Sequence, residues 1–338
     1  MARTYIRIGI TMGYTPPFTL STRSVNLIAK INEMVGGISS AGPTRDPRLR
    51  RVNRLKSIQS SLAIENNSLT LDQVTDVIDG KPVFGNPREI QEVKNAFAAY
   101  DAMAGMDPIS VTDLLRSHGI MMRSILDDAG KFRRGGVGVF SNEGMVHMGP
   151  PADRVPALIG ELMEWLRDSD DHPLVKGCVF HYEFEFIHPF SDGNGRMGRM
   201  WHTLILSKWR DGMAWVPVES IVREHQQDYY NAIALSTKLG DSGPFIELML
   251  YLISDALKTC MTADDDSARY GLNATERRLL SMIGDGLFKN AEDASLALSV
   301  SKRTVERSIR SLREKGLIRR DGSDKNGRWC ICDDRMSV

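Results

Sequence analysis

The sequence predicts a mainly α-helical protein with one β-hairpin and a smaller second domain at its C-terminal end. Apolar residues recur every three or four positions along most of the 338-residue chain, which is the spacing of helices with one buried face. Residues 131–148 break this pattern with two short apolar runs around a turn. After residue 272, three short helical patterns precede a strand, a turn and a second strand.

The first 126 residues are expected to contain five helices. Their apolar positions repeat at helical spacing, and the segments are 24–34, 47–64, 69–78, 87–100 and 110–126. The first should close at Gly36 and Gly37. Ser110 is a suitable N-cap for the last, because its hydroxyl can accept a hydrogen bond from a free N–H of the first turn.

The middle of the chain combines a hairpin with further helices. The runs 135–140 and 145–148 flank Ser-Asn-Glu-Gly, a good connection between two antiparallel strands. Helical patterns follow at 155–168, 196–209, 223–239 and 244–258. Residues 173–187 fit two patterns, because Tyr182, Phe184 and Phe186 alternate as in a strand while Phe180, Phe184 and Ile187 have helical spacing.

Residues with chemistry concentrate in the run His-Pro-Phe-Ser-Asp-Gly-Asn-Gly-Arg-Met-Gly-Arg, from His188 to Arg199. The proline directly after His188 disfavours α geometry there, so an incoming helix should end. Gly193 and Gly195 allow a tight bend and a close approach to a ligand. Arg196 and Arg199 then share a face of the next helix, whose free N–H groups attract anions. This arrangement predicts a polyphosphate site, and an ordinary capping turn is the alternative.

This run resembles the signature of the Fic (Fido) family, His-Pro-Phe-x-Asp/Glu-Gly-Asn-Gly-Arg-x-x-Arg, at every fixed position. The resemblance implies a Fic helical core with a β-hairpin flap, a helix at 173–187, and transfer of AMP from ATP to a protein hydroxyl. It makes His188 the general base toward a Ser, Thr or Tyr of the target, and Asp192 the carboxylate that holds Mg²⁺. The residues that would bind the phosphates are Gly193, Asn194, Gly195, Arg196, Met197, Gly198 and Arg199.

A second motif lies at the end of the helix expected at 47–64. Ser61, Glu65 and Asn66 match the inhibitory pattern Ser/Thr-x-x-x-Glu-Gly/Asn of many Fic proteins, and Ser61 and Glu65 project the same way, one turn apart. The resemblance implies that Glu65 pairs with Arg199 and occupies space that the γ-phosphate needs. A solvated glutamate at a helix C-terminus, electrostatically a poor position, is the alternative.

Two further segments would border the nucleotide. The flap of Fic proteins docks the target as an added strand, which suits an exposed strand edge, and covers the adenine. The adenine and ribose contacts implied here are Met145, Val146, His147, Met148, Tyr229 and Tyr230. For the tyrosine pair, aromatic packing between helices is the alternative.

The C-terminal segment resembles a winged helix-turn-helix domain. Asn273 and Glu276 begin a capping-box-like helix, helical patterns follow at 291–298 and 301–315, and Gly316 ends the last one. Eight Lys/Arg and two Glu lie between residues 302 and 320, a local excess of +6 that suits DNA contact through residues 300–330. A dimerising or protein-binding domain with a solvated basic face is the alternative.

Four segments are therefore expected. Residues 1–106 form an N-terminal helical cap containing the inhibitory helix at about 47–66, and residues 107–260 form the Fic core. An aspartate-rich linker at 261–271 leads to the winged helix domain at 272–338.

Composition narrows the setting. Lys and Arg number 43 and Asp and Glu 43, so bulk charge points to neither nucleic acid nor membrane. The four cysteines are too scattered for a disulfide framework, and Cys330 and Cys332 lack the partner pair of a zinc site. No apolar run is long enough to cross a membrane and no signal segment is expected, which indicates a cytoplasmic protein.

Several functions remain open at this level. The first is autoinhibited AMP transfer to a target protein or to the chain itself, with ATP and Mg²⁺. Some Fic relatives move phosphate, phosphocholine or UMP instead, and the phosphate-transferring ones carry Lys where this chain has Gly195. The others are removal of AMP, with Glu65 positioning water, and a DNA-binding regulator whose Fic fold senses nucleotide. A homodimer is compatible with each function.

Overall fold

The protein divides into two compact units, Met1–Cys260 and Met261–Val338, in a computed structural model. The structure describes residues 14–41, 47–141, 144–269, 271–284, 288, 290–298, 300–321 and 328–332. Each unit is a separate body with its own hydrophobic core.

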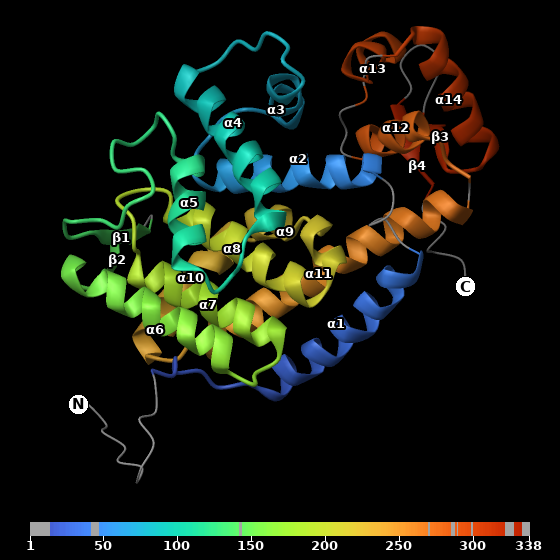
Figure 1. Cartoon of the computed structure of the whole chain (residues 1–338). Helices are drawn as coiled ribbons and strands as arrows, with labels where there is room; N and C mark the ends of the chain where they lie inside the picture. The colour runs from blue at the N-terminus through green and yellow to red at the C-terminus, as the bar shows by residue number, and fades with distance from the viewer. Residues whose placement is uncertain are drawn as a thin grey trace. The chain divides into compact units, whose positions relative to one another are not determined.

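Helices dominate the first unit (Figure 1). Before the hairpin lie α1 (Thr22–Ala41), α2 (Pro47–Ile64), α3 (Leu71–Ile78), α4 (Pro87–Ala102), the 3₁₀ turn η1 (Met103–Gly105) and α5 (Val111–Met121). The hairpin is β1 (Gly138–Ser141) and β2 (Gly144–Met148). After it come η2 (Ala152–Arg154), α6 (Val155–Asp168), α7 (Pro173–Ile187), α8 (Asn194–Trp209), η3 (Asp211–Trp215), α9 (Val218–Glu224), α10 (Gln226–Leu239) and α11 (Gly243–Arg269).

The helices α7 and α8 form the centre of this unit. Phe180 and Phe184 of α7 and Trp201 and Leu204 of α8 have no exposed surface. Because α7 is covered on almost every side, its sequence lacks the polar stripe of a surface helix and its periodicity is ambiguous. The structure resolves residues 173–187 as a helix, as the family resemblance implied.

The helix α2 packs against α9, α4 and α8. Leu55, Ile58 and Leu62 are its buried stripe, and its bounds are those expected from the sequence. This packing holds the C-terminal end of α2 beside the first turns of α8.

Three helices end several residues away from the expected position. The helix α1 continues through Gly36 and Gly37 to Ala41, because a helical glycine costs only about 1 kcal/mol and Ile31 and Val35 anchor the preceding turns. The helix α5 stops at Met121 rather than residue 126. The helix α11 extends beyond residue 258 to Arg269, so most of the expected linker is helical, propagated from a well-packed start.

The hairpin has the expected antiparallel pairing. Gly138 pairs with Met148 and Ser141 with Gly144, and the register shifts between Val139 and Phe140. The central residues of the expected connection, 142–143, lie outside the described part of the chain.

The second unit contains α12 (Ala274–Gly284), α13 (Ala291–Leu298), α14 (Lys302–Glu314), β3 (Ile318–Asp321) and β4 (Arg328–Ile331), the two strands being antiparallel. Leu279, Val305 and Leu312 are completely buried in its hydrophobic core. Asn273 caps α12, and Glu276 reaches back to the Asn273 N–H at 2.8 Å, which completes the expected capping box. The connection between the strands, 322–327, lies outside the described residues. Among the helices that the structure describes, none is both long and apolar enough to cross a membrane.

Candidate active site

The loop between α7 and α8 is closed by its own side chains. His188 has a left-handed backbone (φ 51°) that ends α7, and Gly193 (φ 84°) begins α8. Asn194 receives the Phe190 N–H at 2.9 Å and donates to the Phe190 carbonyl at 3.0 Å. The φ of Gly193 favours glycine, and a β-carbon there would lie 2.7 Å from the sulfur of Met122, so that side chain would have to move.

The imidazole of His188 is held in the form of a base. Its Nδ1 lies 3.3 Å from the Glu185 carbonyl, and because a carbonyl can only accept, Nδ1 carries the proton and the lone pair belongs to Nε2. Burial lowers the pKa of His188 below its ordinary value of 6.5. The ring is therefore neutral at pH 7 and able to accept a proton.

Arg133 joins this loop to the base of the hairpin. Its guanidinium donates to the carbonyls of His188 (2.7 Å), Pro150 (2.6 Å), Gly135 (2.8 Å) and Ile187 (3.3 Å). Its side chain is almost completely buried. One cation thus fixes the backbone of His188 and both ends of the hairpin segment.

Glu65 covers the N-terminal end of α8. Its carboxylate accepts from Arg199 Nη2 at 2.7 Å, and Arg199 also donates to the Ser61 hydroxyl (3.1 Å) and carbonyl (3.0 Å). A β-carbon on Gly195 would collide with Glu65 Oε1 and would lie 2.9 Å from Arg199 Nη1. Burial is the largest single effect on Arg199 and opposes its charge, but Glu65, Tyr229 and Glu185 together outweigh it and raise the pKa of Arg199. An internal carboxylate therefore fills the place where a helix N-terminus attracts an anion.

A second set of charges lies beside this contact. Arg196 donates to Asp192 Oδ1 at 3.2 Å and to Glu92 Oε1 at 3.3 Å, and Gly193 N–H donates to Asp192 at 2.6 Å. The guanidinium of Arg88 lies 3.6 Å from Asp192 Oδ2. The Asp192 side chain is 42% exposed, whereas that of Arg196 is 5% exposed. Asp192 is thus the carboxylate of this set that reaches solvent most freely.

Behind the site lies a buried polar cluster. Glu185 Oε1 is 3.9 Å from His181 Nε2, and in the described structure it has no hydrogen-bond partner. Burial raises the pKa of Glu185 to about 7, although the nearby Arg199 opposes the rise. A β-carbon on Gly198 would lie 2.7 Å from Glu185 Oε1, so the glycine allows α7 and α8 to approach closely.

Comparisons with known proteins agree with this geometry. The sequence pattern of the Fic/DOC family matches residues 108–206. A crystal structure of a Fic family protein from Desulfovibrio desulfuricans G20 is 44% identical in sequence and covers 96% of this chain and 100% of that chain, with a TM-score of 0.72. This chain belongs to the Fic family.

More distant Fic proteins share part of the chain. Protein adenylyltransferase Fic from Aedes aegypti is 26% identical over 235 residues, which are 65% of this chain and 44% of the relative. Protein adenylyltransferase fic-1 from Caenorhabditis elegans is 25% identical over 247 residues, 69% of this chain and 46% of the relative. The chain thus spans less than half the length of these relatives. A solved segment of Fic-1 from Caenorhabditis elegans, 22% identical over 71% of this chain with a TM-score of 0.60, shares the fold.

The residues of the Fic motif do not all face the same space. Met197 is fully buried, and its N–H donates to the Gly193 carbonyl at 3.0 Å, so it offers nothing to a phosphate. The free N–H groups of the first turn belong to residues 194, 195 and 196. The amide side chain of Asn194 is used within the loop, which leaves its backbone for an anion.

The position of Glu65 in this Fic protein has a local explanation. Asn66, two residues after the end of α2, adopts a left-handed backbone (φ 67°), a conformation that Gly and Asn reach most easily. The Gly/Asn position of the motif thus stops the helix, and Glu65, the residue directly after α2, pairs with Arg199.

The tyrosine pair divides between core and surface. Tyr229 is 1% exposed, and its hydroxyl lies 3.0 Å from His181 Nε2. Its position therefore fits the alternative of packing between helices. Tyr230 is partly exposed, and burial together with the nearby Glu65 carboxylate raises its pKa. The side chains of Met145, Val146, His147 and Met148 lie outside what the structure describes, although β2 itself packs against α10.

Sequence reasoning missed three supports of the Fic loop. Arg133 and Glu92 belong to no motif and are far from the loop in sequence. His118 of α5 is the third: its ring accepts the Gly130 N–H at 2.9 Å and lies 3.0 Å from the Asp192 carbonyl. Its ring stacks on that of Phe190 with the centroids 3.7 Å apart, and burial lowers its pKa to about 4. His118 therefore supports the loop as a neutral side chain.

Proposed function

We propose that this protein transfers AMP from ATP to a hydroxyl of a target protein or of itself. The observation that carries the proposal is the neutral His188 beside a helix N-terminus whose two arginines can bind phosphates. The relatives named protein adenylyltransferase support it.

The chemistry needs positioning and charge neutralisation more than covalent help. The target hydroxyl gives its proton to His188 Nε2 as its oxygen attacks the α-phosphorus of ATP. The bond from that phosphorus to the oxygen bridging to the β-phosphate breaks, and pyrophosphate leaves. Arg196, Arg199 and the free N–H groups of α8 hold the β- and γ-phosphates.

Mg²⁺ fits this chemistry with Asp192 as its protein ligand. Mg²⁺ is commonly held by one or two carboxylates together with substrate phosphates and water. The part-exposed Asp192 meets that requirement, and among the described residues no cluster of three acidic, His or Cys side chains offers a complete protein site. Bound there, the ion would neutralise phosphate charge, and Arg88, 3.6 Å away, would have to turn aside.

In this proposal, the Glu65 carboxylate keeps the active site from binding ATP productively. The carboxylate occupies Arg199 and the space over Gly195, so the γ-phosphate has neither its guanidinium nor its room. ATP can then bind only in a non-productive pose. Residues 1–106 act in this proposal as the inhibitory cap, residues 107–260 as the catalytic core with its flap as the docking edge for the target, and residues 272–338 as a separate domain after the segment 261–271.

The position of the label in ATP tests the reaction type. The protein with Glu65→Gly is incubated with Mg²⁺ and either [α-³²P]ATP or [γ-³²P]ATP, and protein-bound label is counted. AMP transfer predicts label only from the α position and a mass increase of one AMP per site. Label from the γ position would indicate phosphate transfer instead. His188→Ala should remove all α label.

A second function, DNA binding by the C-terminal unit, rests on the surface of α14. Arg303, Arg307 and Arg310 are exposed and share one face of this helix, whereas Lys302 and Lys315 pair with Glu292 and Glu276. Such a face can neutralise DNA phosphates. The test is binding of the full chain to a labelled duplex at several salt concentrations. Replacing the three arginines with Ala should weaken binding and flatten its salt dependence, and no binding by the unchanged protein at low salt contradicts the function.

A further inference from the structure

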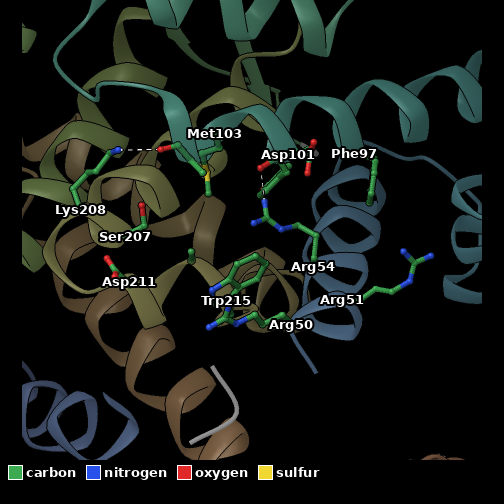
Figure 2. Close-up of a pocket in the computed structure, with 13 residues that line it drawn as sticks. Arg50, Arg51, Arg54, Phe97, Asp101, Met103, Ser207, Lys208, Asp211 and Trp215 are labelled. Carbon is green, nitrogen blue, oxygen red and sulfur yellow. Dashed lines mark hydrogen bonds between the residues drawn. The ribbon is translucent and has the colours of Figure 1, made fainter. Parts of the chain in front are cut away.

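A pocket of about 590 Å³ lies between the N-terminal half of α2 and the segment from α8 to η3 (Figure 2). Arg50, Arg51 and Arg54 enter it from α2, Lys208 from α8 and Trp215 from η3. Arg54 precedes Ser61 by seven residues on the same helix, about 10 Å along its axis. The pocket is therefore a different site from the one at His188, but it shares a helix with the inhibitory segment.

Cations and aromatic rings alternate along its wall. The Arg54 guanidinium lies 4.7 Å from the centre of the Trp215 ring and 5.3 Å from that of Tyr100. Arg50 lies 5.2 Å from the same Trp215 ring. Guanidinium groups held against aromatic faces are fixed in direction and keep N–H donors at their edges, which suits an anion attached to a flat ring.

The charge of the lining also favours an anion. Four cations line the pocket against two carboxylates, Asp101 and Asp211. Arg51 pairs with Asp79, which does not line the pocket, whereas Lys208 has an exposed side chain that donates to the Ala104 carbonyl at 3.3 Å. A pocket of this volume is of the size that binds small molecules.

We propose that this pocket binds a small molecule with an anionic group on a planar ring, and that its occupation loosens the Glu65–Arg199 contact. The anionic group meets Arg50, Arg54 and Lys208, and the ring lies against Trp215. The second half of the proposal rests on the inhibitory role of Glu65, whereas the first half does not depend on catalysis.

The coupling runs through hydrogen bonds around the buried carboxylate of Glu219. Arg54 donates to the Tyr100 carbonyl at 2.7 Å, and the Tyr100 hydroxyl donates to Glu219 at 2.9 Å. Glu219 also accepts from Ser57 of α2 at 2.7 Å and from Thr203 of α8 at 3.1 Å. Ser57 is one turn before Ser61 and Thr203 one turn after Arg199. An anion that competes with the Tyr100 carbonyl for Arg54 weakens the attachment of α2 to α4 and, through Glu219, to α8.

Calorimetry with 1-naphthyl phosphate as the probe tests the site on the full chain. Lys208→Glu at the exposed rim should weaken binding about tenfold or more, since it replaces a charge-assisted contact with repulsion. Lys56→Glu, an exposed change on α2 outside the lining, should leave binding unchanged. Absence of binding to the unchanged protein, or equal losses in both variants, overturns the site.

Hydrogen exchange tests the coupling without any catalytic assay. Saturating probe should speed exchange of the amides of residues 61–66 in the unchanged protein and leave it unaltered in Lys208→Glu. Binding without faster exchange in that segment overturns the coupling and leaves AMP transfer, which is tested by labelling, as a separate question.

Discussion

The Glu65 carboxylate and the Arg199 guanidinium meet at 2.7 Å over the first turn of α8, with unequal burial. The Arg199 side chain is 2% exposed and that of Glu65 is 31% exposed. Arg199 also donates to the Ser61 hydroxyl and carbonyl, and the Glu185 carboxylate favours its charge electrostatically. The proposed inhibition is therefore expected to be relieved by a movement of Glu65 and the end of α2, with the buried Arg199 staying in place.

Arg133→Ala should both destabilise the protein and slow AMP transfer. The change leaves four carbonyl groups around the His188 loop and the hairpin base without their donor. We expect a loss of about 2–4 kcal/mol in the free energy of unfolding, measured by urea denaturation. Arg134→Ala, at the exposed neighbouring position, is the matched control and should change neither property. Equal stability of the two variants would show that the hydrogen bonds of Arg133 do not stabilise the loop and the hairpin base.

The pH dependence of labelling should have an acidic limb from His188. Burial lowers its pKa, and a general base acts in its neutral form, so the rate rises with pH through that lowered pKa. By pH 6.5, the ordinary pKa of histidine, the base is already mostly available. The measurement is kcat/KM against pH in the Glu65→Gly protein. A limb centred above 6.5 would contradict the proposed state of His188.

Glu185→Gln should stabilise the protein more at pH 8 than at pH 5. The folded pKa of Glu185 is raised to about 7 from 4.5, so its contribution to stability is full below pH 4.5 and is lost as pH rises through 7. Glutamine removes that loss, and the difference between the two pH values should be roughly 2 kcal/mol by denaturant titration. The other buried glutamate of α7, Glu183, is present in both proteins and cancels.

Glu164→Gln is the matched control for this comparison, because Glu164 is exposed on α6. It should show no such pH-dependent gain. The same gain in both variants would indicate an effect of net charge and would remove the special role of Glu185.

The features that could be predicted from the sequence are those determined by residues that are neighbours in the chain. The run from His188 to Arg199 carries its own turn, helix start and charges, and Ser61 to Asn66 carries its own helix stop. The family fold and its hairpin followed from them and are confirmed.

The parts that sequence could not predict depend on packing between distant segments. Nothing local distinguishes Arg133, which binds the loop, from its exposed neighbour Arg134. Tyr229 and Tyr230 are adjacent, yet one is core and the other reaches the surface. The pocket at Trp215 is lined by segments from three parts of the chain, so its charge pattern arises only when the helices pack together.

The most direct test of inhibition by Glu65 is the initial rate of labelling with [α-³²P]ATP and Mg²⁺. The rate is measured in three proteins: the unchanged protein, the Glu65→Gly variant, and the double variant that carries both Glu65→Gly and His188→Ala. Release of Arg199 should raise the rate roughly tenfold to a hundredfold in Glu65→Gly, since a guanidinium aimed at the phosphates becomes available. The double variant should show no labelling. Equal rates in the unchanged protein and Glu65→Gly would contradict the claim that Glu65 holds the site off.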